Sequence, residues 1–372
     1  MSKKRIAIVA NTTWNIYNFR LNIIRKLLDE NYEVFVIAPL DEYIEYKEKF
    51  PGVKHIPLKN LNRNNTNPLK DLQLIMELKR IYNEIRPDVI LHYTHKPNIY
   101  GGIAAKLNKI KSIAVVTGLG YAFIHKGWLN TFTKKLYSLV GKYHSKIIFE
   151  NQDDLKYFIE EKLIRADKGI AIKGCGVDTA IYLPYLNGKK EEKVYFTFLG
   201  RLLYDKGIVE FVEAARQIKS EIKDVEFWVL GELDAENPSR VEKKELLGWI
   251  EDGIIVYQGF QKDVRPYIAK SDCIVLPSYR EGMPRIILEA MSMAKPVITT
   301  RTAGCRETVI ENISGYLVNV EDVEDLVKAM KEMINIGNEK RVEMGKAGRE
   351  LAIKEFNSEK IAQALFEIIA VN

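Results

Sequence analysis

The stretch CIVLPSYREGMPRIILEAMSMAKPVIT, residues 273–299, decides the fold. The apolar run Ile274–Leu276 ends at Pro277, as a buried strand does, and the polar loop Ser278–Pro284 follows. Apolar residues at helical spacing after a proline then predict a helix over 285–294. This order places free N–H groups of a helix at the carboxyl end of a strand, where α/β proteins bind anions.

Two carboxylates accompany this element. Glu281 lies in the loop, and Glu289 follows eight residues later, which we interpret as about two helical turns. Eight residues at about 100° each return to nearly the same face, so both side chains are expected to point towards one ligand. Carboxylates accept hydrogen bonds from sugar hydroxyls, and N–H groups suit phosphate, so the pattern predicts a sugar-nucleotide site. Either glutamate alone would be interpreted as a solvated residue at a helix start.

The bulk composition indicates a globular protein with two α/β domains. The chain has 372 residues, of which 47% are hydrophobic and 28% are charged. Its cysteines, Cys175, Cys273 and Cys305, lack metal-ligand spacing and indicate thiols in a reducing compartment. Residues 1–5 run directly into a strand-like segment that is too short for a signal peptide or a membrane span. A cytoplasmic protein is therefore expected.

Positive charge is concentrated in the first half of the chain. Residues 1–190 hold 31 Lys and Arg against 18 Asp and Glu, a net of +13, and the remainder carries −7, which gives the total of +6. Eight lysines and no acid lie between Gly101 and Phe149. Nucleic acid would fit such a surface, an anionic membrane is favoured by the aromatic residues of the same segment, and a solvated basic surface stays open. We predict that the basic, amphipathic helix over 128–143 faces a membrane.

The first strand, 5–10, leads into the polar loop 11–20. This loop has no GxGxxG, which argues against a dinucleotide-binding enzyme. Its polar side chains are candidates for binding an acceptor substrate or phosphate, while turn and capping roles stay open. We single out Asn15, Tyr17 and Arg20 as acceptor candidates.

A later strand, 89–91, ends in a segment rich in polar side chains. His95, Lys96 and Asn98 follow it, and strand exits of this kind face the ligand cleft of α/β folds. His95 could donate a hydrogen bond to a reacting oxygen, and no second cluster supports a metal-ligand role. After the strand at 115–116, Gly118 and Gly120 allow close approach of the backbone to a ligand.

The second half repeats the alternation of strands and helices. The strand 194–199 ends in GRLLYDKG, residues 200–207, before a helix over 208–219. Arg201 and Lys206 are two cations at a strand exit, suited to a diphosphate that gains charge as it leaves. No DxD triplet occurs in the chain, so no catalytic metal is expected.

Several motifs resemble those of one enzyme family. Glu281 and Glu289 in EGMPRIILEAMSMAKPVITT resemble the E-x7-E element of retaining glycosyltransferases of the GT-B fold, glycosyltransferase family four. GRLLYDKG resembles the diphosphate-binding element of that family, and KGCGVD, residues 173–178, resembles its segment before the domain crossing. HKPNIYG (95–101) and GLGYAF (118–123) resemble members that extend lipid-diphosphate-linked saccharides.

The resemblance implies two Rossmann-like parallel-sheet domains that face each other across a cleft. Residues 1–185 would form the acceptor-binding, membrane-facing domain, and residues 186–352 the nucleotide-sugar-binding domain, joined by a turn-prone linker at 187–190. Residues 353–372 would form a helix that crosses back to the first domain.

The resemblance also implies roles for individual residues. Glu281 would position the donor sugar, Arg201 and Lys206 would bind its diphosphate, and His95 would face the acceptor or the reacting centre. The helix start at Gly282, Met283 and Pro284 would stabilise the leaving group, and Glu289 would hold the ribose. Phe260 and Val264 belong to a turn expected to lie against the nucleobase. The acceptor candidates are Asn15, Tyr17, Arg20, Lys96, Asn98, Gly118 and Gly120.

The function predicted is a retaining transfer of N-acetylgalactosamine, or another N-acetylhexosamine or hexose, from a UDP-sugar to a polyprenyl-diphosphate-linked saccharide. Such an enzyme would serve glycan, capsule or O-antigen assembly as a peripheral protein on the cytoplasmic face of the inner membrane. It would need no cofactor or metal and would bind no nucleic acid. The alternatives are an epimerase resembling UDP-N-acetylglucosamine 2-epimerase and a basic nucleic-acid-binding protein. An NAD-dependent oxidoreductase is disfavoured because the glycine fingerprint is missing.

Overall fold

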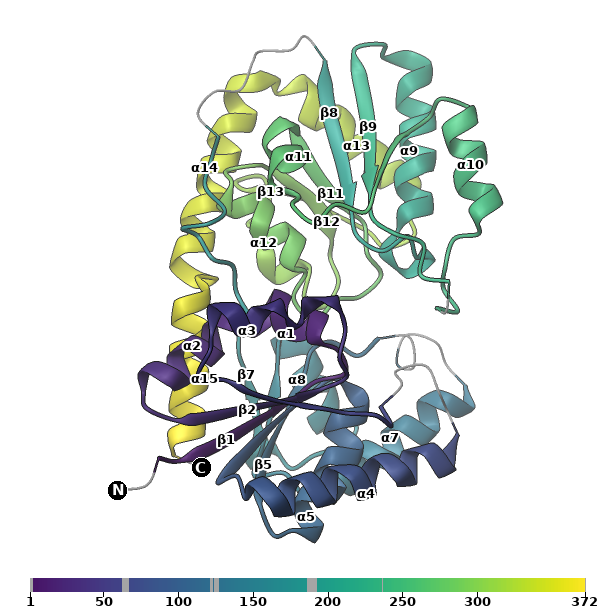
Figure 1. The fold of residues 1–372 in the computed structure, drawn as a ribbon. Coiled ribbons are helices and arrows are strands. Elements are labelled where there is room, and N and C mark those ends of the chain that lie inside the picture. The colour runs from purple at the N-terminus through teal and green to yellow at the C-terminus, as the bar shows by residue number, and fades with distance from the viewer. Residues whose placement is uncertain are drawn as a thin grey trace. The chain divides into compact units, whose positions relative to one another are not determined.

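The computed structural model describes residues 3–61, 67–120, 123, 127–185, 193–235 and 237–371 (Figure 1). The predicted linker at 187–190, and residues 121 and 122 of the GLGYAF segment, lie outside these ranges. Contacts divide the chain into a first unit, Met1–Cys175 with Ser358–Asn372, and a second unit, Gly176–Asn357. The division based on sequence places these boundaries after residues 185 and 352.

The first unit is a parallel sheet in the order β3-β2-β1-β4-β5-β6-β7. Its elements are β1 (Arg5–Val9), α1 (Thr13–Phe19), α2 (Leu21–Asp29), β2 (Glu33–Ala38), η1 (Glu42–Glu45), α3 (Tyr46–Lys49), β3 (Lys54–Pro57), α4 (Pro68–Ile85), β4 (Val89–Tyr93), η2 (Pro97–Gly101), α5 (Gly102–Leu107), β5 (Lys111–Val116), α7 (Trp128–Val140), β6 (Lys146–Phe149), α8 (Gln152–Glu160), η3 (Ala166–Lys168), β7 (Gly169–Ala171) and α15 (Ser358–Ala370). η2 is a π-helix.

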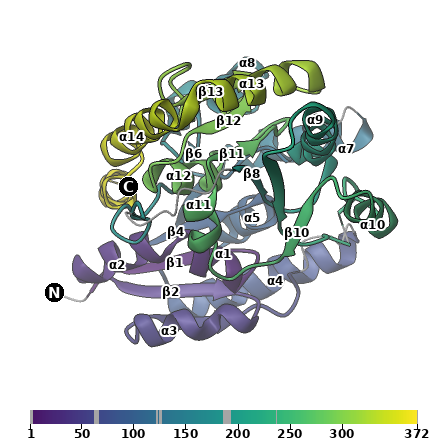
Figure 2. The same cartoon turned by 90° about the horizontal axis from the view of Figure 1, so that it is seen from above.

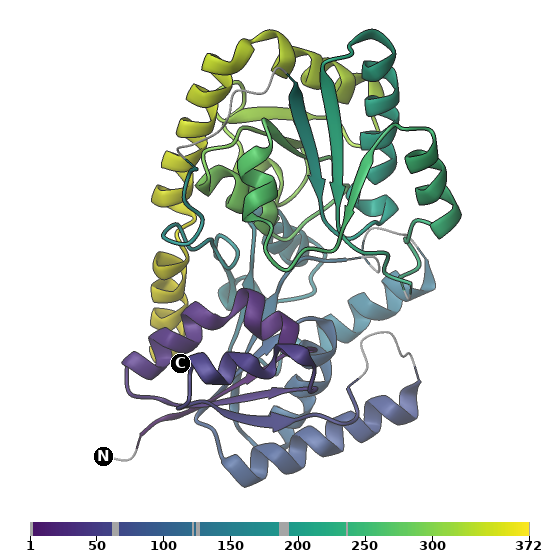
Figure 3. The same cartoon turned by 45° about the horizontal axis from the view of Figure 1, so that its top comes forward.

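Alternate residues of the strands serve two helical layers, because successive side chains of a strand point to opposite faces. Ile6, Ile8 and their neighbours pack with α2 and α15, which lie side by side (Figure 3). Ala7 and Val9 pack on the other face, which α4 and α5 cover. The final helix thus belongs to the first unit.

The second unit is a parallel sheet in the order β10-β9-β8-β11-β12-β13. Its elements are β8 (Val194–Leu199), η4 (Tyr204–Lys206), α9 (Ile208–Glu221), β9 (Val225–Leu230), α10 (Lys243–Glu251), β10 (Val256–Gly259), α11 (Arg265–Lys270), β11 (Cys273–Leu276), α12 (Arg285–Ser292), β12 (Val297–Thr300), η5 (Arg306–Thr308), β13 (Gly315–Val318), α13 (Val323–Asn335) and α14 (Gly337–Glu355). α9 and α13 pack together on one face of this sheet, and α11 and α12 lie on the other (Figure 2).

The predicted pair of Rossmann-like parallel sheets is confirmed. One local expectation is wrong, because the polar segment predicted as a loop over 11–20 contains α1. Thr12 caps this helix, and its hydroxyl accepts a hydrogen bond from the Asn15 N–H at 3.0 Å. Asn and Thr, which disfavour helix interiors, here begin a helix instead.

Candidate active site

The second sheet reverses its strand order between β8 and β11. Ligands of open α/β sheets bind outside the carboxyl ends of the strands at such a reversal. β8 and β11 are paired, with Phe196 beside Cys273, so the loops that follow them leave the sheet together. These are the loops that carry Arg201, Lys206 and Glu281.

Backbone contacts hold the two loops against each other. Gly207 has φ of +73°, and a Cβ atom there would lie 2.1 Å from the Pro277 carbonyl oxygen. Only glycine tolerates both that dihedral and that approach. The Tyr279 N–H donates to the Asp205 carbonyl at 2.9 Å, and the Ser278 hydroxyl donates to the same oxygen at 3.0 Å. The residue before Lys206 is therefore fixed to the loop that contains Glu281.

Lys206 and Glu281 form an ion pair. Their side chains are only 22% and 11% exposed, so the pair lies largely out of water. The Glu281 N–H donates to the Ala303 carbonyl at 3.2 Å, and a Cβ atom at Gly304 would lie 2.3 Å from the Gly282 carbonyl oxygen. The segment after β12 thus packs against the backbone of the Glu281 loop and holds it in place.

Arg201 is paired with Asp234, which follows β9, at 2.9 Å. Asp234 is buried, whereas the Arg201 side chain is 45% exposed. The carboxylate therefore holds one guanidinium nitrogen, while the Arg201 side chain as a whole stays nearly half-exposed. A guanidinium has five N–H donors, so an anion can bind beside this salt bridge.

The expectation that Glu281 and Glu289 lie on one face of the same helix is wrong. α12 begins at Arg285, so Glu281 precedes the helix and Glu289 lies in its second turn. The rule of about 100° per residue therefore does not relate the two carboxylates. Glu289 is buried and pairs with Arg285 Nε at 2.7 Å. The pKa of the neighbouring Tyr182 is raised, chiefly because Tyr182 is itself buried and secondly because the charge of Glu289 lies close by.

The other predicted donor residues lie at the same edge of the second sheet. Pro284 is the N-cap residue of α12 and makes no side-chain capping bond, while Gly282 and Met283 are buried just before it. Phe260 is 47% exposed after β10, and Val264 is the N-cap residue of α11. Because all the strands are parallel, the loop after β10 emerges on the side where Arg201 lies.

The first sheet reverses its order between β1 and β4, where Thr94, which was not predicted, and Asn11, which belongs to the candidate polar loop 11–20, follow the two strands. Thr94 has φ of +72°, which is rare for a β-branched residue. Its hydroxyl oxygen, and the Asn11 side-chain oxygen after β1, are buried without a hydrogen-bond partner in the described part of the chain. The strand order is the signal that would have found Thr94 and singled out Asn11 within its loop, since both follow the strands that flank the reversal.

The predicted residues after β4 mostly point into the protein. The Asn98 amide donates to the Val115 carbonyl at 3.0 Å, and Lys96 pairs with Asp71 at 2.8 Å. His95 Nδ1 lies 2.9 Å from the Tyr137 hydroxyl, and burial lowers the pKa of His95, so the ring is neutral at physiological pH. Gly118 and Gly120, predicted to approach a ligand, both have positive φ, of 110° and 62°.

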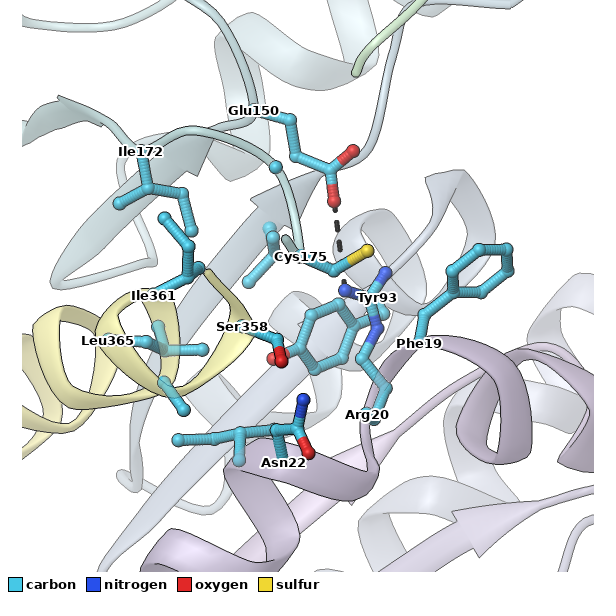
Figure 4. Close-up of a pocket in the computed structure, with 14 residues that line it drawn as sticks. Phe19, Arg20, Asn22, Tyr93, Glu150, Ile172, Cys175, Ser358, Ile361 and Leu365 are labelled. Carbon is cyan, nitrogen blue, oxygen red and sulfur yellow. Dashed lines mark ion pairs between the residues drawn. The ribbon is translucent and has the colours of Figure 1, made fainter. Parts of the chain in front are cut away.

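The predicted acceptor residues of α1 divide into two kinds. Tyr17 is half-buried, and its hydroxyl accepts from Lys49 at 3.1 Å, whereas Asn15 and Arg20 are buried. Arg20 stacks 4.0 Å over the ring of Tyr93 and lies 3.6 Å from Glu150. Figure 4 shows the guanidinium and this carboxylate pointing towards each other beside a pocket. Burial raises the pKa of Glu150 to about 7, although the charge of Arg20 opposes the rise.

Three further observations concern the residues that the structure describes. No group of three or more His, Cys, Asp or Glu side chains among them is placed to hold a metal ion. Cys175, Cys273 and Cys305 are not joined by disulfide bonds, and the last two are buried. No helix in the described ranges is long and apolar enough to cross a membrane.

Comparison with known proteins gives two family matches and several relatives. Residues 186–351 match the model of "Glycosyl transferases group 1", and residues 5–151 match "Glycosyl transferase 4-like". The chain is 30% identical over 338 residues to the N,N'-diacetylbacillosaminyl-diphospho-undecaprenol alpha-1,3-N-acetylgalactosaminyltransferase of Campylobacter jejuni, with 87% of each chain covered. It is 25% identical to the UDP-Gal:alpha-D-GlcNAc-diphosphoundecaprenol alpha-1,3-galactosyltransferase of Escherichia coli, covering 82% of this chain and 80% of that one.

A solved structure shares the fold over nearly the whole chain. Anabaena Alr3699/HepE, in complex with UDP and glucose, superposes with a TM-score of 0.82 at 19% identity, over 99% of this chain and 100% of the other. At this identity the likeness concerns the fold, and it confirms the predicted GT-B class.

Proposed function

The chain belongs to the group 1 and family 4-like glycosyltransferases, and on this premise we propose that it transfers a sugar from a UDP-sugar to a polyprenyl-diphosphate-linked saccharide. Because it belongs to this family, the protein is a glycosyltransferase, and we propose its donor, its acceptor and its stereochemistry. The observation that carries it is the meeting of Lys206 and Glu281 at the strand reversal of the second sheet, with Arg201 on the same loop.

The second unit binds the donor in this proposal. When the bond between sugar and diphosphate breaks, negative charge develops on the leaving UDP, and cations already in place stabilise it. Lys206 and Arg201 supply those cations, aided by the start of α12 at Gly282, Met283 and Pro284. Glu281 then accepts hydrogen bonds from hydroxyls of the donor sugar. Glu289 holds the ribose, and the turn with Phe260 and Val264 lies against the base.

The first unit binds the acceptor. Two relatives are named for acceptors that consist of a sugar on diphospho-undecaprenol, which supports a lipid-linked acceptor here. Both names also state an alpha-1,3 linkage in the product, and one names UDP-Gal, in which the sugar is α-linked to the diphosphate. We therefore assign to this enzyme a transfer that retains the α configuration. N-acetylgalactosamine is the sugar we assign to the donor. In this proposal His95 supports the acceptor side of the site through the Leu119 backbone, to which its ring is hydrogen-bonded.

The chemistry proposed needs neither a protein nucleophile nor a metal. The leaving phosphate accepts the proton of the attacking hydroxyl on the same face of the sugar, and Arg201 and Lys206 carry the charge that a divalent ion would otherwise balance. The enzyme acts at the cytoplasmic face of the inner membrane. There the exposed Trp128 and Phe132 of α7 contact lipid. No nucleic-acid partner is part of this proposal.

The test is a matrix of UDP-sugars against lipid-linked saccharides, with released UDP and extended acceptor both measured. UDP-N-acetylgalactosamine with an undecaprenyl-diphosphate-linked acceptor should give both products. Conversion of a UDP-sugar in the absence of any acceptor would instead indicate epimerase chemistry. If all UDP-sugars remain intact with every lipid-linked acceptor, the proposal is wrong.

A further inference from the structure

The outer face of α4 carries an apolar stripe. Leu69, Leu72 and Met76 are 71%, 55% and 55% exposed. At 100° per residue these three side chains fall within an arc of about 60°. The opposite face of the helix is buried against the sheet through Leu74, Leu78 and Ile81. A helix at a protein surface normally turns polar residues outward, so a second apolar stripe needs a partner of its own.

The charges around this stripe fit an anionic surface. By the same rule Lys79 and the exposed Arg80 lie about 20° beyond the two edges of the stripe, and Arg80 also pairs with Glu84. The acidic side chains of the same turns, Asp71 and Glu77, form hydrogen bonds and ion pairs with other parts of the first unit. Glu77 accepts from the N–H groups of Lys59 and Asn60 at 2.9 and 3.0 Å. Apolar side chains flanked by basic residues are the composition of helices that lie in the interface of an anionic membrane.

α4 is tied directly to the segment that follows β4. Asp71, on the inner side of α4, accepts from Lys96 Nζ at 2.8 Å and from the Tyr100 hydroxyl at 2.6 Å. η2, which contains Tyr100, packs against both α4 and α7. α7 therefore contacts the same short helix η2 as α4 does, and it exposes Trp128, Phe132 and Leu139. Both flanking helices expose apolar side chains.

We propose that α4 is a second membrane-contacting helix, which inserts Leu69, Leu72 and Met76 among the acyl chains of an anionic bilayer. Because Asp71 fixes Lys96 and Tyr100, this insertion holds the segment after β4 at the height of the lipid headgroups. A polyprenyl-diphosphate-linked saccharide presents its diphosphate at that height. Three aliphatic side chains fall well short of the roughly 800 Å² per partner that a stable protein interface buries, which favours lipid over a second copy of the chain. The inference deepens the proposed function and rests on it for the identity of the acceptor.

The experiment compares two triple variants of the full chain. Leu69→Ser, Leu72→Ser and Met76→Ser remove the stripe. Leu247→Ser, Val342→Ser and Ile353→Ser remove three exposed apolar side chains of the second unit, which are 45%, 44% and 41% exposed, and serve as the control. Co-sedimentation with vesicles of phosphatidylcholine and phosphatidylglycerol measures binding, and circular dichroism checks the fold. The α4 variant should bind at least tenfold more weakly, and the control should bind as the wild type does.

Transfer assays complete the test. With UDP-N-acetylgalactosamine as the donor, the α4 variant should lose activity on an undecaprenyl-linked acceptor in vesicles. It should keep its activity on a short-chain, water-soluble acceptor. Unchanged vesicle binding overturns the inference, and so does a shift from dimer to monomer in light scattering, which would make a second copy the occupant. Stripe-dependent vesicle binding by a protein inactive on every acceptor would refute the proposed function and leave the membrane contact standing.

Discussion

Replacing Lys206 by alanine separates the resting role of this residue from its catalytic role. In the structure its ammonium group is paired with Glu281, and in the proposed reaction the same group stabilises the leaving diphosphate. Lys206→Ala removes both contributions while leaving Gly207 and the backbone bonds of the loop intact. The variant should therefore lose both stability and rate, and the loss of rate should remain where the protein is fully folded.

The two magnitudes follow from the burial of the pair. Breaking a fully buried ion pair by removing one partner costs about 3–5 kcal/mol, and the 22% exposure of Lys206 reduces this to roughly 1–3 kcal/mol. Removing one preorganised donor from a site of developing charge costs about 2.7–4 kcal/mol of transition-state stabilisation, or roughly 100- to 1,000-fold in kcat. The rate effect should thus persist under conditions where the variant is fully folded.

Released UDP, measured at saturating donor and acceptor, gives kcat, and urea denaturation of the second unit gives the change in stability. Lys219→Ala is the matched control, because Lys219 lies at the other end of α9 and its ammonium group donates to the Gly253 carbonyl at 2.7 Å. The control should lose stability without losing rate. If Lys206→Ala keeps kcat within about threefold of the wild type, Lys206 does not act on the leaving group.

Three further predictions concern the loops, a buried carboxyl group and metal ions. Gly207→Ala should destabilise the second unit by more than about 2 kcal/mol, because it adds a Cβ atom 2.1 Å from the Pro277 carbonyl oxygen at a residue with φ of +73°. Gly248→Ala is the control: this position in α10 has open space around it, so the substitution should be neutral or stabilising in the same denaturation assay. Burial raises the pKa of Glu150 from 4.5 to about 7, so the stability of the wild type relative to Glu150→Gln should fall by about 3 kcal/mol as pH rises from 4.5 to 7; the buried histidines, whose pKa values are lowered, affect both proteins alike, and a difference that does not change with pH would contradict the assignment. Prior incubation with EDTA should leave transfer unchanged, and a requirement for added Mg²⁺ would contradict the mechanism.

The strands were the most predictable part of the fold. Parallel strands buried on both faces leave continuous apolar runs, and Val194–Leu199 and Cys273–Leu276 could be located from such runs. The edge strand Lys54–Pro57 is half-exposed and carries no run, so it left no comparable signal. α1 was missed because its first residues favour loops as strongly as helix caps.

The site was predictable in composition and less so in contacts. Cations after β8 and a carboxylate after β11 could be read from the motifs, but the contact between Lys206 and Glu281 depends on the pairing of two strands far apart in sequence. The same holds for Arg20 and Glu150, which sequence reasoning could not join. The helix start at Arg285 was predicted correctly, yet the phase of Glu281 relative to that helix could not be, because a loop residue obeys no helical period.

The stoichiometry of a single reaction tests the central claim most directly. UDP-N-acetylgalactosamine and an undecaprenyl-diphosphate-linked saccharide are incubated with the enzyme, and UDP, extended lipid and the anomeric configuration of the new linkage are determined together. The account predicts one UDP released for each acceptor extended by one sugar in α linkage. Release of UDP without extension, or a β linkage in the product, would contradict it.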